Sequence, residues 1–275
     1  MKAVCNICPH KCKLSEGQYG FCNGRIGSEG KVISDNYGKI TAIALDPIEK
    51  KPLYHFYPGS RILSVGSYGC NLRCPFCQNC DISMVKGTEI DYADITIEEL
   101  VKKALELRSR GNIGIAYTYN EPLIGYEFVK DCSTLAKENG LKNVAVTNGY
   151  ICEDPLRELL PTIDAFNIDL KSFTKEFYTK IKGNLDTVKN TIIIAAEHCH
   201  VEVTTLIIPR ENDSEEEMEA LSDWLGSISP DIPLHISRFF PRWKVTDKEA
   251  TPVRTVYRLA EVARRNLKYV YEGNC

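Results

Sequence analysis

Four cysteines fall within the twelve residues of the stretch GCNLRCPFCQNC, residues 69–80. Cys70, Cys74 and Cys77 form a C-x3-C-x2-C pattern, and Cys80 follows three residues later. Thiolates bind zinc or iron, but a structural zinc usually takes its four ligands from paired C-x2-C knuckles. The spacing departs from that pattern, so an iron–sulfur centre competes with zinc here. Cys80 is then either a fourth ligand that closes the site or a bystander.

A second group of four cysteines lies near the amino terminus with the spacing C-x2-C-x3-C-x9-C. Its members are Cys5, Cys8, Cys12 and Cys22. The first residues lack the apolar run of a signal peptide, and no window approaches the roughly 18 apolar residues of a membrane span. We therefore expect a cytoplasmic protein whose thiols stay reduced. These four cysteines predict a second metal site, either a structural zinc or an auxiliary iron–sulfur cluster, with His10 as an alternative ligand.

The composition is that of an ordinary globular protein. The chain has 275 residues, of which 43% are hydrophobic and 26% are charged, and its formal net charge is −3. This mild negative charge provides no basic face for nucleic acid or for a membrane surface, so we expect neither as a partner. Residues 1–58 are too few to be stable through burial alone. We therefore expect a Cys-rich metal-binding lobe with short strands at 1–58 and a larger domain at 59–275.

Strand-like and helix-like segments alternate from residue 61 onward in six or seven units. Capping boxes at Thr96 with Glu99 and at Ser214 with Glu217 predict two of the helix starts. This alternation predicts a parallel sheet with helices outside it, and it favours a closed or partial barrel over a doubly wound sheet.

Polar motifs stand where the predicted strands end. They are Asn120-Glu121 in YTYNEP, Thr147-Asn148 in VTNGY, Asp169 and Lys171 in IDLKS, and His235 and Arg238 in HISRFFPR. Because the carboxyl ends of parallel strands meet at one face, these motifs and Cys70 predict a single active site. Each motif also has a structural interpretation. These are a helix-start turn at 120–122, a tight Asn-Gly turn at 148–149, a solvated ion pair at 169 and 171, and packing roles for His235 and Arg238.

The cysteine loop, with the aromatic Phe76 before its third cysteine and a predicted strand ahead of it, resembles the cluster-binding loop of the radical S-adenosylmethionine (SAM) enzymes. The resemblance implies an α/β fold with a partial (βα)6-type TIM barrel. It also implies that Cys70, Cys74 and Cys77 hold a [4Fe-4S] cluster by three irons and leave the fourth iron to SAM. An electron from the cluster would cleave SAM, and the 5′-deoxyadenosyl radical would abstract hydrogen from a substrate.

The same resemblance implies which residues bind SAM. In related enzymes a Gly-Gly-Glu motif after the second strand binds the SAM amino group. Here Glu121, assisted by Asn120, stands in its place without the two glycines. Asn148, Asp169 and Lys171 match motifs of glycyl-radical-enzyme activases that hold SAM. Arg238 and Phe76 complete the implied cofactor-binding set.

The whole chain, including LDPIEKKPLYHFYPGS ahead of the cluster loop, resembles the radical SAM component of the AmmeMemoRadiSam system, which is similar to pyruvate formate-lyase activating enzymes. This resemblance implies an electron donor such as flavodoxin or ferredoxin, and hydrogen abstraction from a protein or peptide. Tyr54 and His55, within that stretch, either touch the substrate or pack between the lobes. Three other functions remain open: modification of a small metabolite or RNA, electron transfer without catalysis, and a zinc-dependent interaction protein.

Overall fold

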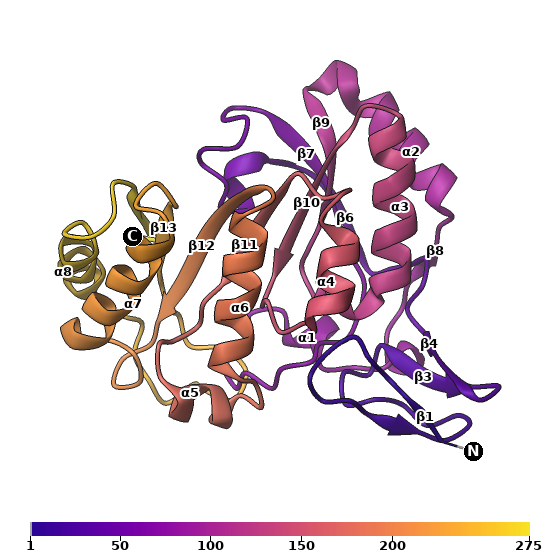
Figure 1. Ribbon diagram of the computed structural model, residues 1–275, viewed down its shortest axis with the longest axis horizontal. Helices are drawn as coiled ribbons and strands as arrows, with labels where there is room; N and C mark the ends of the chain where they lie inside the picture. The colour runs from indigo at the N-terminus through magenta and orange to yellow at the C-terminus, as the bar shows by residue number, and fades with distance from the viewer. Residues whose placement is uncertain (1) are drawn as a thin grey trace.

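A single eight-stranded sheet organises the molecule, whose computed structural model describes residues 2–275 (Figure 1). Its strands lie in the order β14-β13-β12-β11-β10-β9-β7-β6. The strands from β7 onward are parallel to one another. They are β7 (Arg61–Gly66), β9 (Asn112–Tyr117), β10 (Lys142–Thr147), β11 (Ala165–Asp169), β12 (His200–Ile207), β13 (Leu234–Arg238) and β14 (Val270–Gly273). Strand β6 (Ala42–Pro47) pairs antiparallel with β7 and forms one edge.

Helices follow the parallel strands and cover one face of the sheet (Figure 1). The longer ones are α2 (Ile97–Glu106), α3 (Tyr126–Glu138), α4 (Glu153–Leu159), α6 (Leu185–Ala196), α7 (Glu215–Ile228) and α8 (Val253–Ala263). The shorter ones are α1 (Cys80–Ser83), α5 (Lys175–Lys180) and the 3-10 turns η1 (Ile48–Lys50), η2 (Gly87–Glu89), η3 (Leu107–Arg110) and η4 (Pro122–Gly125). Six strand–helix units precede β14, which confirms the expected (βα)6-type architecture.

The predicted helix starts are only partly as expected. Thr96 and Glu99 form a complete capping box at α2, because each side chain hydrogen-bonds the backbone N–H of the other residue. At α7 the Ser214 hydroxyl accepts from the Glu217 N–H, but the reciprocal bond is missing. The Glu217 carboxylate instead accepts from Ser172 Oγ at 2.6 Å and from the backbone of the loop after β11. The predicted second capping box is therefore only half formed.

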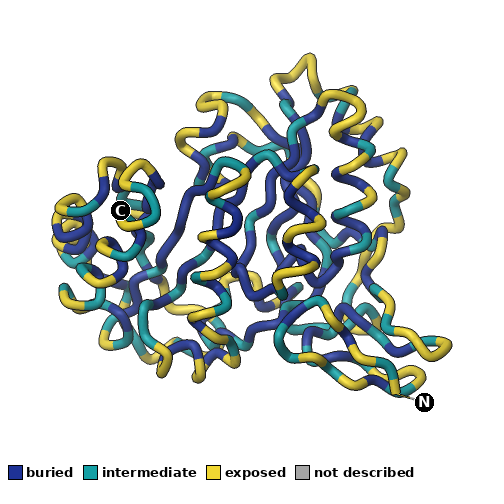
Figure 2. The backbone as a smooth tube through the Cα atoms, in the orientation of Figure 1, coloured by how far each residue is buried: buried dark blue, intermediate teal, exposed yellow. Residues whose placement is uncertain are grey.

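Residues 48–57 fill the inner face of the sheet. Ile48, Leu53 and Phe56 form an apolar cluster with the inward side chains of the strands, such as Ala116 and Val144. Burial of each aliphatic side chain contributes roughly 1.5–3 kcal/mol. Figure 2 shows that the strands of the sheet are mostly buried, whereas the helices that cover them are partly exposed.

A buried carboxylate anchors this inner segment. Glu202 of β12 accepts the backbone N–H groups of Tyr54 and His55 at 3.0 and 2.7 Å, and the Nε2 atoms of His200 and His235 at 2.9 and 2.6 Å. Tyr54 packs edge-on against His235. Tyr54, His55 and His235 thus have packing and hydrogen-bonding roles at the amino-terminal side of the strands, away from the strand ends that carry the predicted site.

The amino-terminal region consists of short antiparallel pairs. They are β1 (Ala3–Val4) with β2 (Lys13–Leu14), β3 (Arg25–Ser28) with β4 (Lys31–Ser34), and β5 (Lys39–Ile40) with β8 (Ala93–Asp94). An ion pair joins this region to α3, because Arg25 donates two hydrogen bonds of 2.7 Å to the Glu127 carboxylate. Strand β6, within the first 58 residues, belongs to the large sheet, while the domain division at residue 58 stays a prediction. Within residues 2–275 no helix combines the length and apolar character needed to cross a bilayer.

Candidate active site

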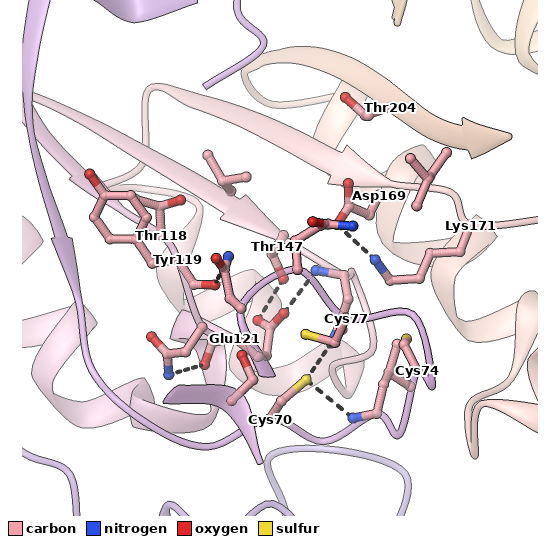
Figure 3. Close-up of a pocket in the computed structure, with 18 of the residues that line it drawn as sticks. Cys70, Cys74, Cys77, Thr118, Tyr119, Glu121, Thr147, Asp169, Lys171 and Thr204 are labelled. Carbon is pink, nitrogen blue, oxygen red and sulfur yellow. Dashed lines mark hydrogen bonds and ion pairs between the residues drawn. The ribbon is translucent and has the colours of Figure 1, made fainter. Parts of the chain in front are cut away.

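A cavity of about 380 Å³ opens at the carboxyl ends of the parallel strands (Figure 3). The cysteine loop after β7 forms one wall, and the ends of β9, β10 and β11 form another. The predicted residues that line it are Cys70, Cys74, Phe76, Cys77, Asn120, Glu121, Asn148, Asp169 and Lys171. Segments that are far apart in the sequence therefore meet at one face, as the βα alternation predicts.

Three thiols face the cavity together (Figure 3). Burial raises the pKa of Cys70 and Cys77, and it raises the pKa of Cys74 to about 12. Such thiols stay protonated unless a positively charged centre replaces their protons, and metal binding does so. Cys80 is also buried, but it does not line the cavity and its thiol lies beside Asp81. The geometry thus leaves three thiols, not four, on the cavity wall.

The thiols do not converge on a single point. Across residues 2–275, no three His, Cys, Asp or Glu side chains stand where they could hold one metal ion. A structural zinc needs four donors at about 2.0–2.3 Å from one centre. Three ligands of a [4Fe-4S] cluster bind three different irons, so they surround the cluster rather than meet. The arrangement of Cys70, Cys74 and Cys77 around a roomy cavity fits a cluster better than a lone zinc.

Glu121 lies buried where β9 meets the cavity. Its Oε1 accepts from Thr147 Oγ1 at 2.7 Å and from the Leu123 N–H at 3.0 Å, and its Oε2 accepts from the Asn148 N–H at 2.8 Å. Burial raises the pKa of Glu121 to about 7, although these hydrogen bonds act to lower it. The bond from Leu123 also caps η4, so the helix-start interpretation holds as well. A carboxylate offers about four acceptor positions, which leaves one for a cationic ligand.

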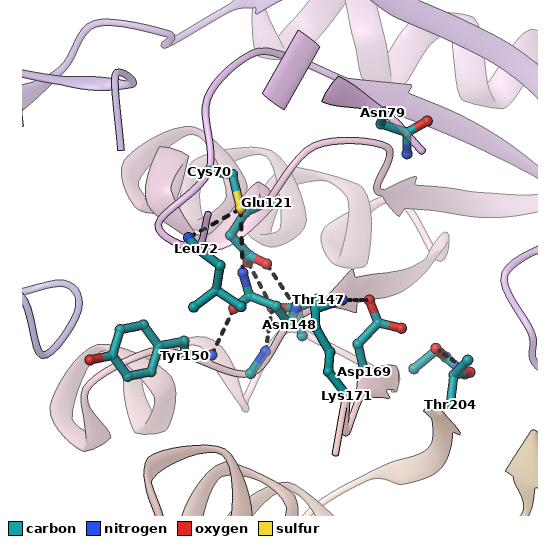
Figure 4. A network of polar contacts seen from close by, with 12 residues as sticks. Cys70, Leu72, Asn79, Glu121, Thr147, Asn148, Tyr150, Asp169, Lys171 and Thr204 are labelled. Carbon is teal, nitrogen blue, oxygen red and sulfur yellow. Dashed lines mark hydrogen bonds and ion pairs between the residues drawn. The ribbon is translucent and has the colours of Figure 1, made fainter. Parts of the chain in front are cut away.

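Asn148 joins the end of β10 to the cysteine loop (Figure 4). Its Nδ2 lies 3.6 Å from Cys70 Sγ and 2.9 Å from Asn71 Oδ1, and its Oδ1 accepts from the Tyr150 N–H. Hydrogen bonds to cysteine sulfur are among the factors that set the potential of an iron–sulfur cluster. The Leu72 N–H provides a second contact to the same sulfur at 3.4 Å.

Asn120 has a different position from the one that a direct ligand needs. Its Oδ1 accepts from the Ser67 N–H at 2.9 Å, and its Nδ2 donates to the carbonyls of Tyr68 and Gly69 at 3.0 and 3.1 Å. The amide is therefore engaged on both sides in holding the start of the cysteine loop. Although Asn120 lines the cavity, these contacts favour a positioning role.

Asp169, the last residue of β11, and Lys171, two residues further on, face the cavity together. Lys171 Nζ lies 2.9 Å from Asp169 Oδ2 (Figure 3). Burial acts to lower the pKa of Lys171, but the Asp169 carboxylate and the Cys74 sulfur outweigh it and hold that pKa above its ordinary value. The bond to Asp169 uses one of the three N–H groups of the ammonium. The pair therefore presents both a carboxylate and an ammonium group to a ligand.

Arg238 does not line the cavity. Its Nε donates to the Thr251 carbonyl at 2.6 Å, and its guanidinium lies over the Phe240 ring. Its neighbour Ser237 lines the cavity instead. Successive residues of a strand point to opposite faces, so Ser237 takes the inward position at this strand end, one residue before the predicted Arg238.

The cavity lining also includes residues to which the sequence analysis gave no role, among them Lys50, Lys51 and Tyr119. Lys51 is buried, and its Nζ lies 2.8 Å from Asp46 Oδ2, which also accepts from the Tyr119 hydroxyl at 2.7 Å. Tyr119 has a φ of 71°, in the left-handed region that non-glycine residues rarely adopt. The signal was present in YTYNEP, where Tyr119 directly precedes Asn120-Glu121, but its positive φ could not be inferred.

The four amino-terminal cysteines line a second, much smaller cavity of about 10 Å³ together with His10. Burial raises the pKa of Cys8 to about 12 and that of Cys22 to about 11. The ring of His10 is engaged elsewhere, since its Nε2 lies 2.8 Å from the Asn71 carbonyl oxygen. The four thiols are thus gathered as the spacing predicts, while the presence and identity of a metal stay a prediction.

Comparison with known proteins shows the family to which the chain belongs. Residues 64–224 match the model of the radical SAM superfamily. An uncharacterized protein of Methanocaldococcus jannaschii is 43% identical over 277 aligned positions, which cover 99% of this chain and 81% of that protein. The pyruvate formate-lyase-activating enzyme of Clostridium pasteurianum is 30% identical over 176 positions, which cover 62% of this chain and 71% of that enzyme.

A solved structure shares the fold. The crystal structure of Streptococcus suis SuiB bound to S-adenosylmethionine superposes with a TM-score of 0.60 at 15% identity, over 78% of this chain and 52% of that one. The cysteine loop and the residues at the ends of β9, β10 and β11 lie within the segment matched by the family model. The chain belongs to the radical SAM superfamily.

Proposed function

We propose that this chain is a SAM-cleaving enzyme of the AmmeMemoRadiSam group that abstracts hydrogen from a protein or peptide substrate. A bound [4Fe-4S] cluster and SAM would supply reductive cleavage of the sulfonium and a hydrogen-abstracting 5′-deoxyadenosyl radical. One observation carries the proposal: three thiols share a single cavity with a carboxylate, an amide and a Lys–Asp pair that suit the amino-acid end of SAM.

In this proposal each side chain binds the part of the cofactors that its chemistry suits. Cys70, Cys74 and Cys77 hold the cluster, and Glu121 uses its remaining acceptor position to accept an N–H of the SAM amino group. Lys171 donates to the SAM carboxylate or ribose. Asp169 holds the Lys171 ammonium group in place through their ion pair. Such charge-assisted hydrogen bonds are shorter and stronger than neutral ones. The Phe76 ring packs against the Phe177 ring, with 5.9 Å between the ring centroids, and would shield the cluster side of the cavity from water.

Asn148 and Asn120 act on the cysteine loop rather than on the substrate. Asn148 donates to the Cys70 sulfur and to Asn71. Asn120 fixes the carbonyls of Tyr68 and Gly69 that precede Cys70. Together they hold the loop against two neighbouring strand ends, and such positioning limits the reorganisation needed when cofactors bind.

The protein or peptide substrate is inferred from similarity. The identity with pyruvate formate-lyase-activating enzymes, 30% for that of Clostridium pasteurianum, favours an activase-like role in which a glycyl radical is made on a partner. We include in the proposal an electron donor such as flavodoxin or ferredoxin, a zinc or iron–sulfur centre at Cys5, Cys8, Cys12 and Cys22, and a cytoplasmic location. The division into a lobe at 1–58 and a barrel at 59–275 belongs to the same proposal.

The test is SAM cleavage by the full chain. The protein is reconstituted with iron and sulfide without oxygen, reduced with dithionite, and mixed with SAM, and 5′-deoxyadenosine is then quantified. The proposal predicts 5′-deoxyadenosine that depends on iron, reductant and Cys74. An iron-loaded protein that forms none would contradict it and would favour a non-catalytic electron carrier.

A further inference from the structure

The two cysteine groups touch backbone to backbone. The Cys70 N–H donates to the Cys22 carbonyl oxygen at 3.0 Å, so one cysteine of each group takes part in the same hydrogen bond. The contact requires glycine at position 69, which has a φ of +87°. A Cβ there would lie 2.5 Å from the Cys22 oxygen and 3.0 Å from the Gly24 nitrogen. No larger residue could bring the two loops this close.

Arg73 ties the same two loops through its side chain. Its guanidinium donates to the carbonyls of Cys70 and Leu72 at 2.7 and 2.9 Å, and also to the carbonyl of Phe21. The group lies 4.1 Å above the Phe21 ring, a distance suited to a cation–π contact. The Arg73 side chain, which lies between Cys70 and Cys74 in the sequence, thus contacts the residue next to Cys22.

The amino-terminal thiols line one small cavity together. Its lining includes Cys5, Cys8, His10, Cys12, Phe21 and Cys22. A metal bound by these thiolates would hold the chain around Cys22 in place. The contacts of Cys22, Phe21 and His10 would then pass this restraint to residues 70–73.

We propose that metal binding by the amino-terminal thiolates orders the cluster loop, and that Arg73 is the positioning residue that couples the two. The inference rests on the proposed function for the roles of the two cysteine groups. The coupling is reciprocal: if metal in the lobe favours iron loading at Cys70, Cys74 and Cys77, iron loading favours metal in the lobe by the same factor. The proposal covers a zinc ion and an iron–sulfur cluster alike, because thiolates bind both.

The experiment isolates the lobe by removing the three cluster ligands. In a full-length C70A/C74A/C77A chain, metal can bind only outside the cluster loop, while the position-70 N–H is retained. Zinc alone is added in one arm, and iron with sulfide under anaerobic conditions in the other. Amide hydrogen exchange is then followed by mass spectrometry in peptides covering residues 3–25 and 66–76, with bound metal counted in parallel.

The predicted result is metal bound at the lobe, and about tenfold slower exchange at residues 69–73 in at least one arm, since several hydrogen bonds become persistent. Adding Arg73→Met removes the slowing at 69–73 but keeps it at 3–25, and Arg73→Lys restores part of it. Arg157→Met, on the exposed surface of α4, leaves both unchanged. Metal bound with no slowing at 69–73 overturns the inference. No metal bound in either arm overturns it together with the second metal site, while SAM cleavage by the wild-type chain tests the main proposal separately.

A second measurement retains every cysteine. In the chain with all cysteines in place, Arg73→Met is predicted to lose iron from the reconstituted cluster loop to a chelator about tenfold faster than wild type, with Arg157→Met equal to wild type. Equal rates for Arg73→Met and Arg157→Met contradict the coupling even if the triple alanine chain fails to fold.

Discussion

Asn148 Nδ2 lies 3.6 Å from Cys70 Sγ, across 78 residues of sequence (Figure 4). This contact links the end of β10 to the first ligand of the cysteine loop. Asn148→Ala removes an N–H donor from the sulfur, so we expect the midpoint potential of the reconstituted cluster to become more negative and reduction by dithionite to be less complete. Redox titration followed by electron paramagnetic resonance measures this. A potential equal to wild type, with Asn190→Ala as the exposed control, would argue against the contact in solution.

Substitution of Cys74 and substitution of Cys80 should have different effects on iron–sulfur loading. Cys74 lines the cavity and Cys80 does not. Cys74→Ala should therefore abolish iron–sulfur loading at this loop and all 5′-deoxyadenosine formation. Cys80→Ala should retain both, because the Cys80 thiol does not line the cavity. Iron and sulfide content per chain and product formation are measured side by side. Loss of the cluster in Cys80→Ala would mean that the site is closed by a fourth thiol.

Glu121 provides the acceptor that the proposal assigns to the SAM amino group. Glu121→Gln keeps one carbonyl oxygen, which can accept from either Thr147 or the Asn148 N–H but not from both, and it removes the charge, so SAM affinity should fall about 10- to 100-fold, as expected for a hydrogen bond to a charged group. Iron content should stay unchanged. Isothermal titration of the reconstituted, unreduced protein gives the dissociation constant. Glu153→Gln, on the exposed surface of α4, serves as the matched control. Equal SAM affinity in Glu121→Gln and wild type would remove Glu121 from the binding site.

Lys171 and Arg238 should respond differently to loss of charge. Lys171 lines the cavity beside Asp169, whereas Arg238 is turned toward Thr251 and Phe240. Lys171→Met should weaken SAM binding about tenfold or more, and Arg238→Met should leave it within a factor of about two. The same titration applies to both variants. A larger loss in Arg238→Met than in Lys171→Met would reinstate the sequence-based assignment of Arg238.

Glu202 predicts an acid-sensitive step in stability. Burial acts to raise its pKa, but the hydrogen bonds from His200, His235 and the backbone at Tyr54 and His55 outweigh it and lower the pKa from 4.5 to about 2. Because the folded-state pKa lies below the ordinary value, this stabilisation is complete above about pH 5 and is lost as the pH falls toward 2. The difference corresponds to about 3 kcal/mol.

Glu202→Gln provides the comparison. Its free energy of unfolding should be lower than that of wild type at pH 7 by about 3 kcal/mol, and it should depend less on pH between 5 and 2. Urea unfolding at a series of pH values measures both quantities. Glu215→Gln, at the exposed start of α7, should follow wild type. Parallel pH profiles for Glu202→Gln and wild type would contradict the role given to this carboxylate.

The sequence was sufficient where a local rule acts alone. The spacing of Cys70, Cys74 and Cys77 and the position of polar residues at strand ends predicted which segments meet, because parallel strands fix a common edge. Asp169 and Lys171 were expected to share a face from their spacing alone, and both line the cavity. For β13 the spacing does not say whether Ser237 or Arg238 faces the cavity, because that register depends on packing against neighbouring strands.

Other features depend on contacts that no local pattern encodes. The Glu217 side chain does not complete the capping box, because it accepts hydrogen bonds from the Ser172 hydroxyl and the Phe173 N–H of the loop after β11. The contact of Lys51 with Asp46 and Tyr119 depends on how residues 48–57 fold back into the sheet. The approach of Cys22 to Cys70 depends on the left-handed conformation of Gly69.

The central claim is a cluster with one iron left for SAM, held by Cys70, Cys74 and Cys77. The most direct measurement is a crystal structure of the reconstituted protein grown without oxygen in the presence of SAM. The account predicts sulfur ligands from these three cysteines alone, with the amino and carboxylate groups of SAM on the remaining iron near Glu121 and Lys171. A fourth ligand from Cys80, or a single zinc ion in the cavity, would contradict it.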